Sequence, residues 1–131
     1  MIVVDTNVLA YLWLPGDRTA QAERLLRSDP NWNAPLLWRS EFRNVLAGSL
    51  RRGDLDLETA LRITDEAEGQ MHGREFTVPS AQVLTRVASS DCSAYDCEFV
   101  VLAEELGVPL FTSDAKLLRS FSAVAKPLGN P

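Results

Sequence analysis

The sequence predicts an α/β sandwich built around a mostly parallel sheet. Short apolar runs, some of them β-branched, alternate along the chain with longer segments whose apolar residues recur at helical spacing. That alternation is typical of parallel strands joined by helices. The 131 residues contain no linker, internal repeat or low-complexity tract, so we expect a single domain over residues 1–131.

The first half of the chain is expected to contribute two strands and four helices. Ile2-Val3-Val4 is a brief, fully apolar run, typical of a buried parallel strand. Gly53 is a helix-ending residue, and Asp56 is a good N-cap for the helix after it. The expected strands are 2–4 and 34–37, and the expected helices are 7–14, 18–27, 39–52 and 57–70, the first two divided by Pro15-Gly16.

The second half is expected to add three strands and three helices. Pro79 suits the first turn of a helix, Ser93 can cap the next one, and Gly107 ends it. The expected strands are 76–78, 110–112 and a weak last strand at 123–126, and the expected helices are 79–89, 94–106 and 114–120.

The composition is that of an ordinary soluble domain, with 46% hydrophobic and 24% charged residues. No stretch approaches the roughly 20 apolar residues of a membrane span, and no basic segment precedes the apolar start. We therefore expect a cytoplasmic protein without a secretory signal. Cys92, Cys97 and the one histidine, His72, cannot supply a zinc ligand set. We expect both cysteines to be free thiols in or near a helix, with a disulfide as the alternative.

The net charge of −5 argues, at first sight, against a nucleic-acid partner. It does not settle the matter, because carboxylates that bind a divalent metal are neutralised in the working state. Four arginines, Arg39, Arg43, Arg51 and Arg52, also lie within one short segment. They are either a local basic patch or simply solvated charges on a helix.

Four acidic residues stand at matching places in the predicted elements. Asp5 directly follows the first strand and Asp114 follows strand 110–112 by two residues, so both lie at the carboxyl ends of strands, which share one edge of a parallel sheet. Glu41 and Asp96 lie in the first turns of helices that begin at that edge. The pattern therefore delivers four carboxylates to one edge. Whether they meet depends on the strand order, which the pattern does not give.

Carboxylates gathered at contact distance repel one another and raise each other's pKa, and a divalent cation removes that cost. Hard oxygen ligands suit Mg²⁺ or Mn²⁺, which can lower the pKa of a bound water and stabilise a phosphate undergoing displacement. Each acid also has a purely structural interpretation. Asp5, Asp96 and Asp114 could cap helices, and Glu41 could complement a helix dipole.

Four segments of the chain, in order, resemble the motifs of the PIN-domain nucleases. They are Ile2–Asn7, Ser40–Leu46, Ser93–Asp96 with the following Val101-Leu102-Ala103, and Gly107–Asp114. The resemblance implies a three-layer α/β/α sandwich with the first strand central, beside the fourth. It also implies a VapC-type toxin, an endoribonuclease dependent on Mg²⁺ or Mn²⁺ that forms homodimers and is silenced by a VapB-like antitoxin.

Carried over residue by residue, the resemblance implies a catalytic and metal-binding quartet of Asp5, Glu41, Asp96 and Asp114, with supporting Thr6, Asn7, Thr112 and Ser113. Arg39, Arg43 and Lys116 are the candidates for contacts with the RNA backbone. The chain departs from the pattern in two places. Cys92 and Cys97 stand where other small residues are more usual, and no further acid follows Asp114, where Ala115-Lys116 stands instead.

Two other functions fit parts of the pattern. A metal-dependent phosphatase or phosphotransferase can also open with a strand and an aspartate, although Asn7 replaces the second aspartate that such enzymes commonly carry. A non-catalytic module that binds RNA or protein is the third hypothesis.

Several remaining residues have structural expectations. We expect His72 to lie in a turn without a special role, and Trp13, Trp32 and Trp38 to be buried in the core or in an interface rather than to stack on bases. Leu9, Leu12 and Trp13 are candidates for part of a dimer interface.

Overall fold

A computed structural model describes residues 1–129. In this part of the chain five strands form one sheet in the order β3-β2-β1-β4-β5. The central strand β1 (Ile2–Val4) pairs with β2 (Trp32–Pro35) and β4 (Leu110–Phe111), and the edges are β3 (Glu75–Phe76) and β5 (Ala125–Lys126). All four pairings are parallel. The predicted parallel sheet is confirmed, with the first strand beside the fourth.

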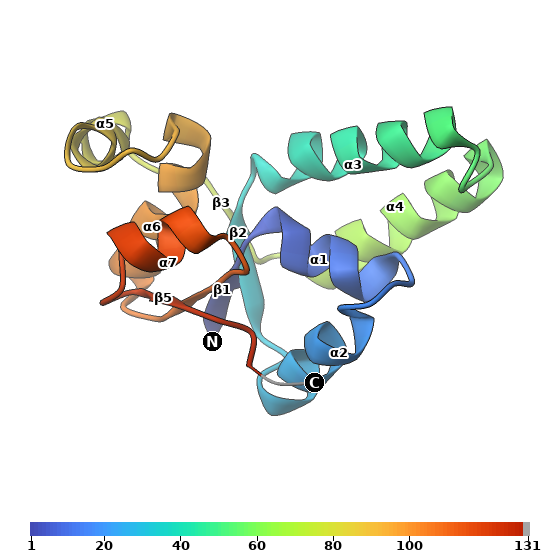
Figure 1. Cartoon of the computed structure of the whole chain (residues 1–131), viewed down its shortest axis with the longest axis horizontal. Coiled ribbons are helices and arrows are strands. Elements are labelled where there is room, and N and C mark those ends of the chain that lie inside the picture. Colours follow the sequence, from blue (N-terminus) through green and yellow to red (C-terminus); the bar gives the residue numbers. More distant parts are fainter. Residues whose placement is uncertain (130–131) are drawn as a thin grey trace.

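Helices cover both faces of this sheet, so the three-layer sandwich is confirmed (Figure 1). To the right of the strands lie α1 (Thr6–Trp13), α2 (Thr19–Ser28), α3 (Trp38–Arg52) and α4 (Leu57–Met71). To the left lie α5 (Ser80–Ala88), α6 (Ala94–Leu106) and α7 (Ala115–Ser120). The helix α6 packs on both β1 and β2, and its middle turns are buried.

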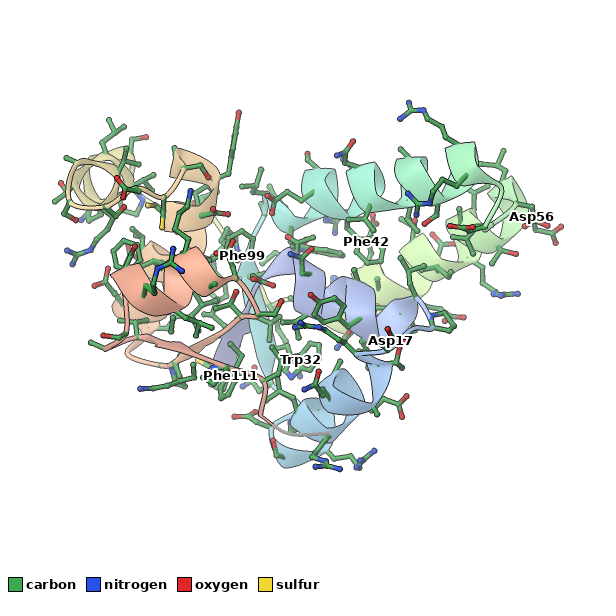
Figure 2. The ribbon with its side chains drawn as sticks, viewed as in Figure 1. Asp17, Trp32, Phe42, Asp56, Phe99 and Phe111 are labelled. Carbon is green, nitrogen blue, oxygen red and sulfur yellow. The ribbon has the colours of Figure 1, made fainter. Side chains whose placement is uncertain are left out.

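The core forms where these layers meet. All three residues of β1 are buried, as expected of a strand covered on both faces. Trp32, Trp38, Phe42 and Phe99 are the largest fully buried side chains. Figure 2 labels Trp32, Phe42 and Phe99, and it shows Phe42 on the side of α3 that faces α1 and α4. The predicted burial of Trp32 and Trp38 is confirmed. Trp13 is half-buried and donates its indole N–H to Gln70 Oε1 at 2.7 Å.

Four of the five expected strands have other bounds in the structure. β4 ends at Phe111 rather than at residue 112, and β5 begins at Ala125 rather than at residue 123. The second strand is Trp32–Pro35 rather than 34–37, because the buried Trp32 pairs in register with Ile2 while Leu36 is already exposed and turns into α3. The third strand is Glu75–Phe76 rather than 76–78, because it pairs only with the end of β2. No alternation of apolar and polar residues marks the start of β2 at Trp32, so the sequence did not reveal this boundary.

The predicted helix ends are confirmed where a cap makes them. The Asp56 carboxylate accepts from Thr59 N, and the Ser93 hydroxyl accepts from Asp96 N. Gly53 and Gly107 have φ values of 77° and 67°, and this left-handed conformation, which favours glycine, ends α3 and α6.

The other structural expectations have mixed outcomes. His72 is exposed in the turn after α4, and both cysteines are free and buried, as predicted. The assignment of Leu9 to an interface is wrong, because this side chain is fully buried in the core. None of the helices within residues 1–129 is long and apolar enough to cross a membrane.

Candidate acidic active site

The four acids predicted from the sequence line one pocket of about 520 Å³ at the carboxyl edge of the sheet. They meet because β1 is central and β4 is its neighbour, which brings Asp5 and the loop before α7 together. The first turns of α3 and α6 open at the same edge from opposite faces of the sheet (Figure 1). The pocket is lined by Asp5, Thr6, Asn7, Leu37, Ser40, Glu41, Asn44, Val45, Tyr95, Asp96, Phe99 and Asp114.

Asp5 is the most buried of the four acids, with 7% of its surface exposed. One carboxylate oxygen accepts from Val8 N at 3.2 Å and so caps α1. The other accepts from the hydroxyl of Thr112, which is fully buried. The Thr112 oxygen also accepts from Asp114 N at 3.0 Å. Thr112 therefore ties the end of β1 to the start of the Asp114 loop.

Burial raises the pKa of Asp5 from 3.8 to about 6. The hydrogen bonds from Thr112 and from the backbone of Val8 and Asn7 oppose this rise, and the negative charge of Asp114 adds to it. Asp5 thus remains a costly buried charge at neutral pH unless a cation approaches it.

The pKa values of Glu41 and Asp96 are also raised by burial and by a neighbouring carboxylate. Burial raises the pKa of Glu41, and the charge of Asp96 raises it further, while Thr6 donates its hydroxyl proton to Glu41 Oε1 at 2.7 Å. Burial also raises the pKa of Asp96, with a further contribution from the charge of Asp114. Each of the four carboxylates is therefore coupled electrostatically to at least one other, through the pairs Asp5–Asp114, Asp96–Asp114 and Glu41–Asp96.

Helix capping is real here, but it does not account for the pocket. Asp5 caps α1, and one oxygen of Asp114 accepts from Lys116 N and Leu117 N at the start of α7. A cap needs only one side-chain oxygen that accepts from the first turn of the helix, and it gains nothing from neighbouring negative charges. Three raised carboxylate pKa values around one pocket therefore need a second explanation.

Of the three basic residues predicted to contact RNA, only Lys116 lies beside the acids, where its charge lowers the pKa of Asp96. Arg39 binds Glu75 at 2.9 Å and Glu68 at 3.0 Å, so its guanidinium is committed to ion pairs. Arg43 lines a groove between α3 and α4 instead. Among the residues that line the acidic pocket there is no lysine or arginine.

The donor set fits a hard divalent cation. The four carboxylates and the neighbouring hydroxyl and amide groups offer oxygen atoms as ligands, which Mg²⁺ and Mn²⁺ prefer. A cation would also offset the free-energy cost of the buried Asp5 charge. Within residues 1–129, no three Asp, Glu, His or Cys side chains stand close enough together to hold an ion as placed. An ion shared by three of these acids therefore requires side-chain movement toward one another.

The supporting residues divide into two groups. Thr6 and Asn7 line the pocket, and Thr112 lies directly behind Asp5. Ser113 does not line it, because its hydroxyl forms a hydrogen bond with the Tyr11 hydroxyl at 2.8 Å.

Sequence reasoning missed several residues of the site. Ser40, Asn44 and Tyr95 line the pocket. Burial raises the pKa of Glu98, and the negative charge of nearby Glu41 raises it further. Helical spacing from Glu41 could have found Asn44, which is three residues further along α3. No signal in the sequence marks the side to which Tyr95 points.

Replacement of Thr112 by valine is expected to raise the pKa of Asp5 above its value of about 6, because the hydroxyl that stabilises the carboxylate is lost. The measurement is a pH titration of the Asp5 carboxyl carbon by ¹³C NMR in metal-free protein. Thr112→Ser keeps the hydroxyl and should titrate close to the wild type. A valine variant that titrates at or below the wild-type value would contradict this role for Thr112.

Solved structures of other proteins share this fold. PAE2754 from Pyrobaculum aerophilum superposes with a TM-score of 0.77 at 22% identity, over 97% of this chain and 90% of that one. FitAcB from Neisseria gonorrhoeae gives 0.75 at 16% identity, over 95% and 96%. VapC20 from Mycobacterium tuberculosis, a sarcin–ricin loop cleaving toxin, gives 0.69 at 19% identity, over 92% and 95%.

The sequence comparison agrees with the fold. Ribonuclease VapC3 from Pyrobaculum aerophilum is 29% identical over 131 residues, which cover 96% of this chain and 98% of that protein. Residues 2–126 match the family described as the PIN domain, and this range contains all four acids of the pocket. The chain therefore belongs to the PIN domain family.

Proposed function

We propose that this chain is an endoribonuclease that depends on Mg²⁺, with Mn²⁺ as a substitute, and that it is the toxin of a VapBC-type toxin–antitoxin pair. The observation that carries the proposal is the single pocket lined by Asp5, Glu41, Asp96 and Asp114 in a PIN-domain chain. The relative named Ribonuclease VapC3 and the cleaving toxin VapC20 support the choice of RNA and of the toxin role.

In this proposal Asp5, Asp96 and Asp114 hold the metal ion, and Glu41 holds a second ion or orients a water. An ion held there would lower the pKa of a bound water and would offset the negative charge that develops on the phosphate. The quartet is thus both the metal-binding and the catalytic set. Its fixed negative charge is the reason that phosphate enters only when a cation is present.

The chain's own residues prepare this site in three ways. Thr112 holds the inner oxygen of Asp5 and the backbone of Asp114, which fixes two carboxylates relative to each other. Thr6 holds Glu41 at 2.7 Å and so orients it. Lys116, whose charge lowers the pKa of Asp96, offers the cation that contacts the RNA backbone.

We further propose a VapB-like antitoxin as the partner, a homodimer as the working form and the cytoplasm as the location. An antitoxin segment that covers the acidic pocket would block both the metal and the RNA. Co-expression with the protein encoded by a neighbouring reading frame tests this, since a true antitoxin co-purifies with the chain and suppresses its cleavage activity. Light scattering of the isolated chain tests the dimer.

The proposed function is tested by incubating the purified chain with tRNA and structured RNAs, with Mg²⁺, with Mn²⁺ and with EDTA. Discrete RNA fragments in the two metal reactions and none in EDTA are expected. Transfer of a phosphoryl group to Asp5 would instead indicate a phosphotransferase. Failure to bind Mn²⁺ by calorimetry, together with absent cleavage, would indicate a non-catalytic binding module.

Mg²⁺ is also expected to stabilise the folded chain, because it binds carboxylates that repel one another only in the native state. At a concentration 100 times its Kd, a single ion adds about 2.7 kcal/mol to the free energy of unfolding. Thermal unfolding at pH 7 with Mg²⁺ and with EDTA measures this, with K⁺ at equal ionic strength as the control. Equal melting temperatures in Mg²⁺ and K⁺ would speak against a specific site.

A further inference from the structure

One aromatic side chain remains without a structural role. The chain has three tryptophans, two tyrosines and five phenylalanines, and all except Tyr95 are buried or half-buried. Tyr95 is 63% exposed. The other tyrosine, Tyr11, bonds through its hydroxyl to Ser113 and stacks beneath the Arg18 guanidinium at 5.5 Å. Within residues 1–129 the Tyr95 hydroxyl has no hydrogen-bond partner.

The position of Tyr95 is specific. It lies in the first turn of α6, directly before Asp96, and it lines the acidic pocket. The same pocket is lined by the exposed residues Ser40 and Asn44. Both belong to α3, which lies on the opposite side of the sheet from α6 (Figure 1). The lining of the pocket thus combines the four carboxylates with the exposed ring of Tyr95 and small polar groups, and it is completed by the apolar side chains Leu37, Val45 and Phe99.

The charge of the pocket restricts how it can hold RNA. The four carboxylates repel phosphate, and no lysine or arginine lines the pocket. The chain as a whole carries a net charge of −5. Counterion release, which usually dominates affinity for nucleic acid, is therefore weak at this place. Beside the metal ion and Lys116, which lies next to Asp96, a contact with the uncharged base is a further source of affinity, and every base can stack on an aromatic ring.

We infer that Tyr95 stacks on an unpaired RNA base next to the phosphate held at the acidic pocket, and that this contact sets the position of the strand. The inference rests on the proposed ribonuclease function. Bases within a duplex are stacked on each other and present no free face, so this contact requires an unpaired base. Tyr95 is a specificity-determining residue here, and the acids remain the catalytic ones.

The test compares wild type, Tyr95→Ala and Tyr95→Phe on a single-stranded oligoribonucleotide in Mg²⁺. Stacking on an aromatic ring contributes about 1–3 kcal/mol per base, so the alanine variant should raise KM by about 5- to 150-fold, with a smaller change in kcat. Phenylalanine keeps the ring and should restore the KM. Leu84→Ala is the matched control, because Leu84 is 62% exposed on α5 and does not line the pocket.

A second substrate separates stacking from a merely structural effect. Oligonucleotides that lack one base at successive positions around the cut site are assayed with wild type and Tyr95→Ala. Removal of the stacked base should weaken wild type by the same factor as the alanine substitution, and should leave the alanine variant unaffected. An equal loss in both proteins at every position, or an unchanged KM in the alanine variant, overturns the inference.

Failure of the proposed function itself gives a different result. If wild type cleaves no RNA in Mg²⁺ or Mn²⁺, an oligonucleotide carrying 2-aminopurine is titrated with each protein, because stacking quenches its fluorescence. Quenching by wild type and not by Tyr95→Ala would retain the stacking role and reject the nuclease. Absence of quenching by both proteins would reject both.

Discussion

Replacement of Asp5 by asparagine is expected to lower the rate of Mg²⁺-dependent RNA cleavage by at least about 10²- to 10³-fold. Asp5 is the deepest carboxylate of the pocket, and asparagine retains its size and its cap on α1 while removing the charge that holds the metal. A catalytic metal lowers the activation free energy by several kcal/mol, and each 1.36 kcal/mol changes the rate by a factor of ten. Single-turnover cleavage assays measure the loss.

The same variant should not be less stable without metal. Because burial raises the native pKa of Asp5 from 3.8 to about 6, the unfolded chain ionises at a lower pH than the folded one. The contribution of the Asp5 carboxyl to stability in EDTA therefore falls as pH rises from about 4 to about 6, by up to about 3 kcal/mol, and stays low above that range. Asp29, Asp56 and Glu75, whose pKa values are lowered in the folded chain, contribute in the opposite direction, so the comparison is made between wild type and variant at each pH. Asparagine has no such charge, so at pH 7 it should gain part of this stability.

Urea unfolding in EDTA at pH 5 and pH 7 tests the second half of this prediction, and circular dichroism tests the fold. The matched control is Asp17→Asn, since Asp17 is exposed in the turn after α1, apart from the pocket (Figure 2). It should change neither cleavage nor stability appreciably. Full cleavage activity of Asp5→Asn would remove the basis of the nuclease assignment, whatever its stability.

Replacement of Phe42 by alanine is expected to destabilise the chain by about 3–5 kcal/mol, the usual cost of a large cavity in a packed core. Phe42 is 1% exposed and meets Trp38 edge to face, with ring centroids 5.6 Å apart. For a domain of this size the loss corresponds to a melting temperature lower by roughly 10–20 °C. Thermal unfolding in the presence of EDTA measures the effect on the fold alone.

Leu61→Ala is the control for Phe42→Ala, because Leu61 on α4 is 58% exposed and its truncation should cost less than about 0.5 kcal/mol. Phe42 follows Glu41 directly on α3, so its loss should also make the position of the Glu41 carboxylate less fixed. We therefore expect slower cleavage even at temperatures at which the variant is folded. A drop of less than about 1 kcal/mol in Phe42→Ala would mean that the first turns of α3 are not packed into the core as described.

The sequence determined the elements and the identity of the four acids. Local signals are sufficient for both, because apolar spacing, helix caps and end glycines act within a few residues of where they stand. Asp56, Ser93, Gly53 and Gly107 mark helix ends that the structure confirms. The start of β2 was predicted two residues too late. No local pattern marks Trp32 as a strand residue, because its burial depends on pairing with Ile2 of the neighbouring strand.

Only the tertiary structure decided what these residues meet. The strand order puts β1 between β2 and β4, and this order, which depends on contacts between segments more than 100 residues apart, brings Asp5 to Thr112 and Asp114. Packing likewise commits Arg39 to Glu75 and leaves Tyr95 open at the pocket. A local sequence pattern shows which side chains a helix or strand carries. Their burial and their electrostatic coupling arise only when segments distant in the sequence pack against one another.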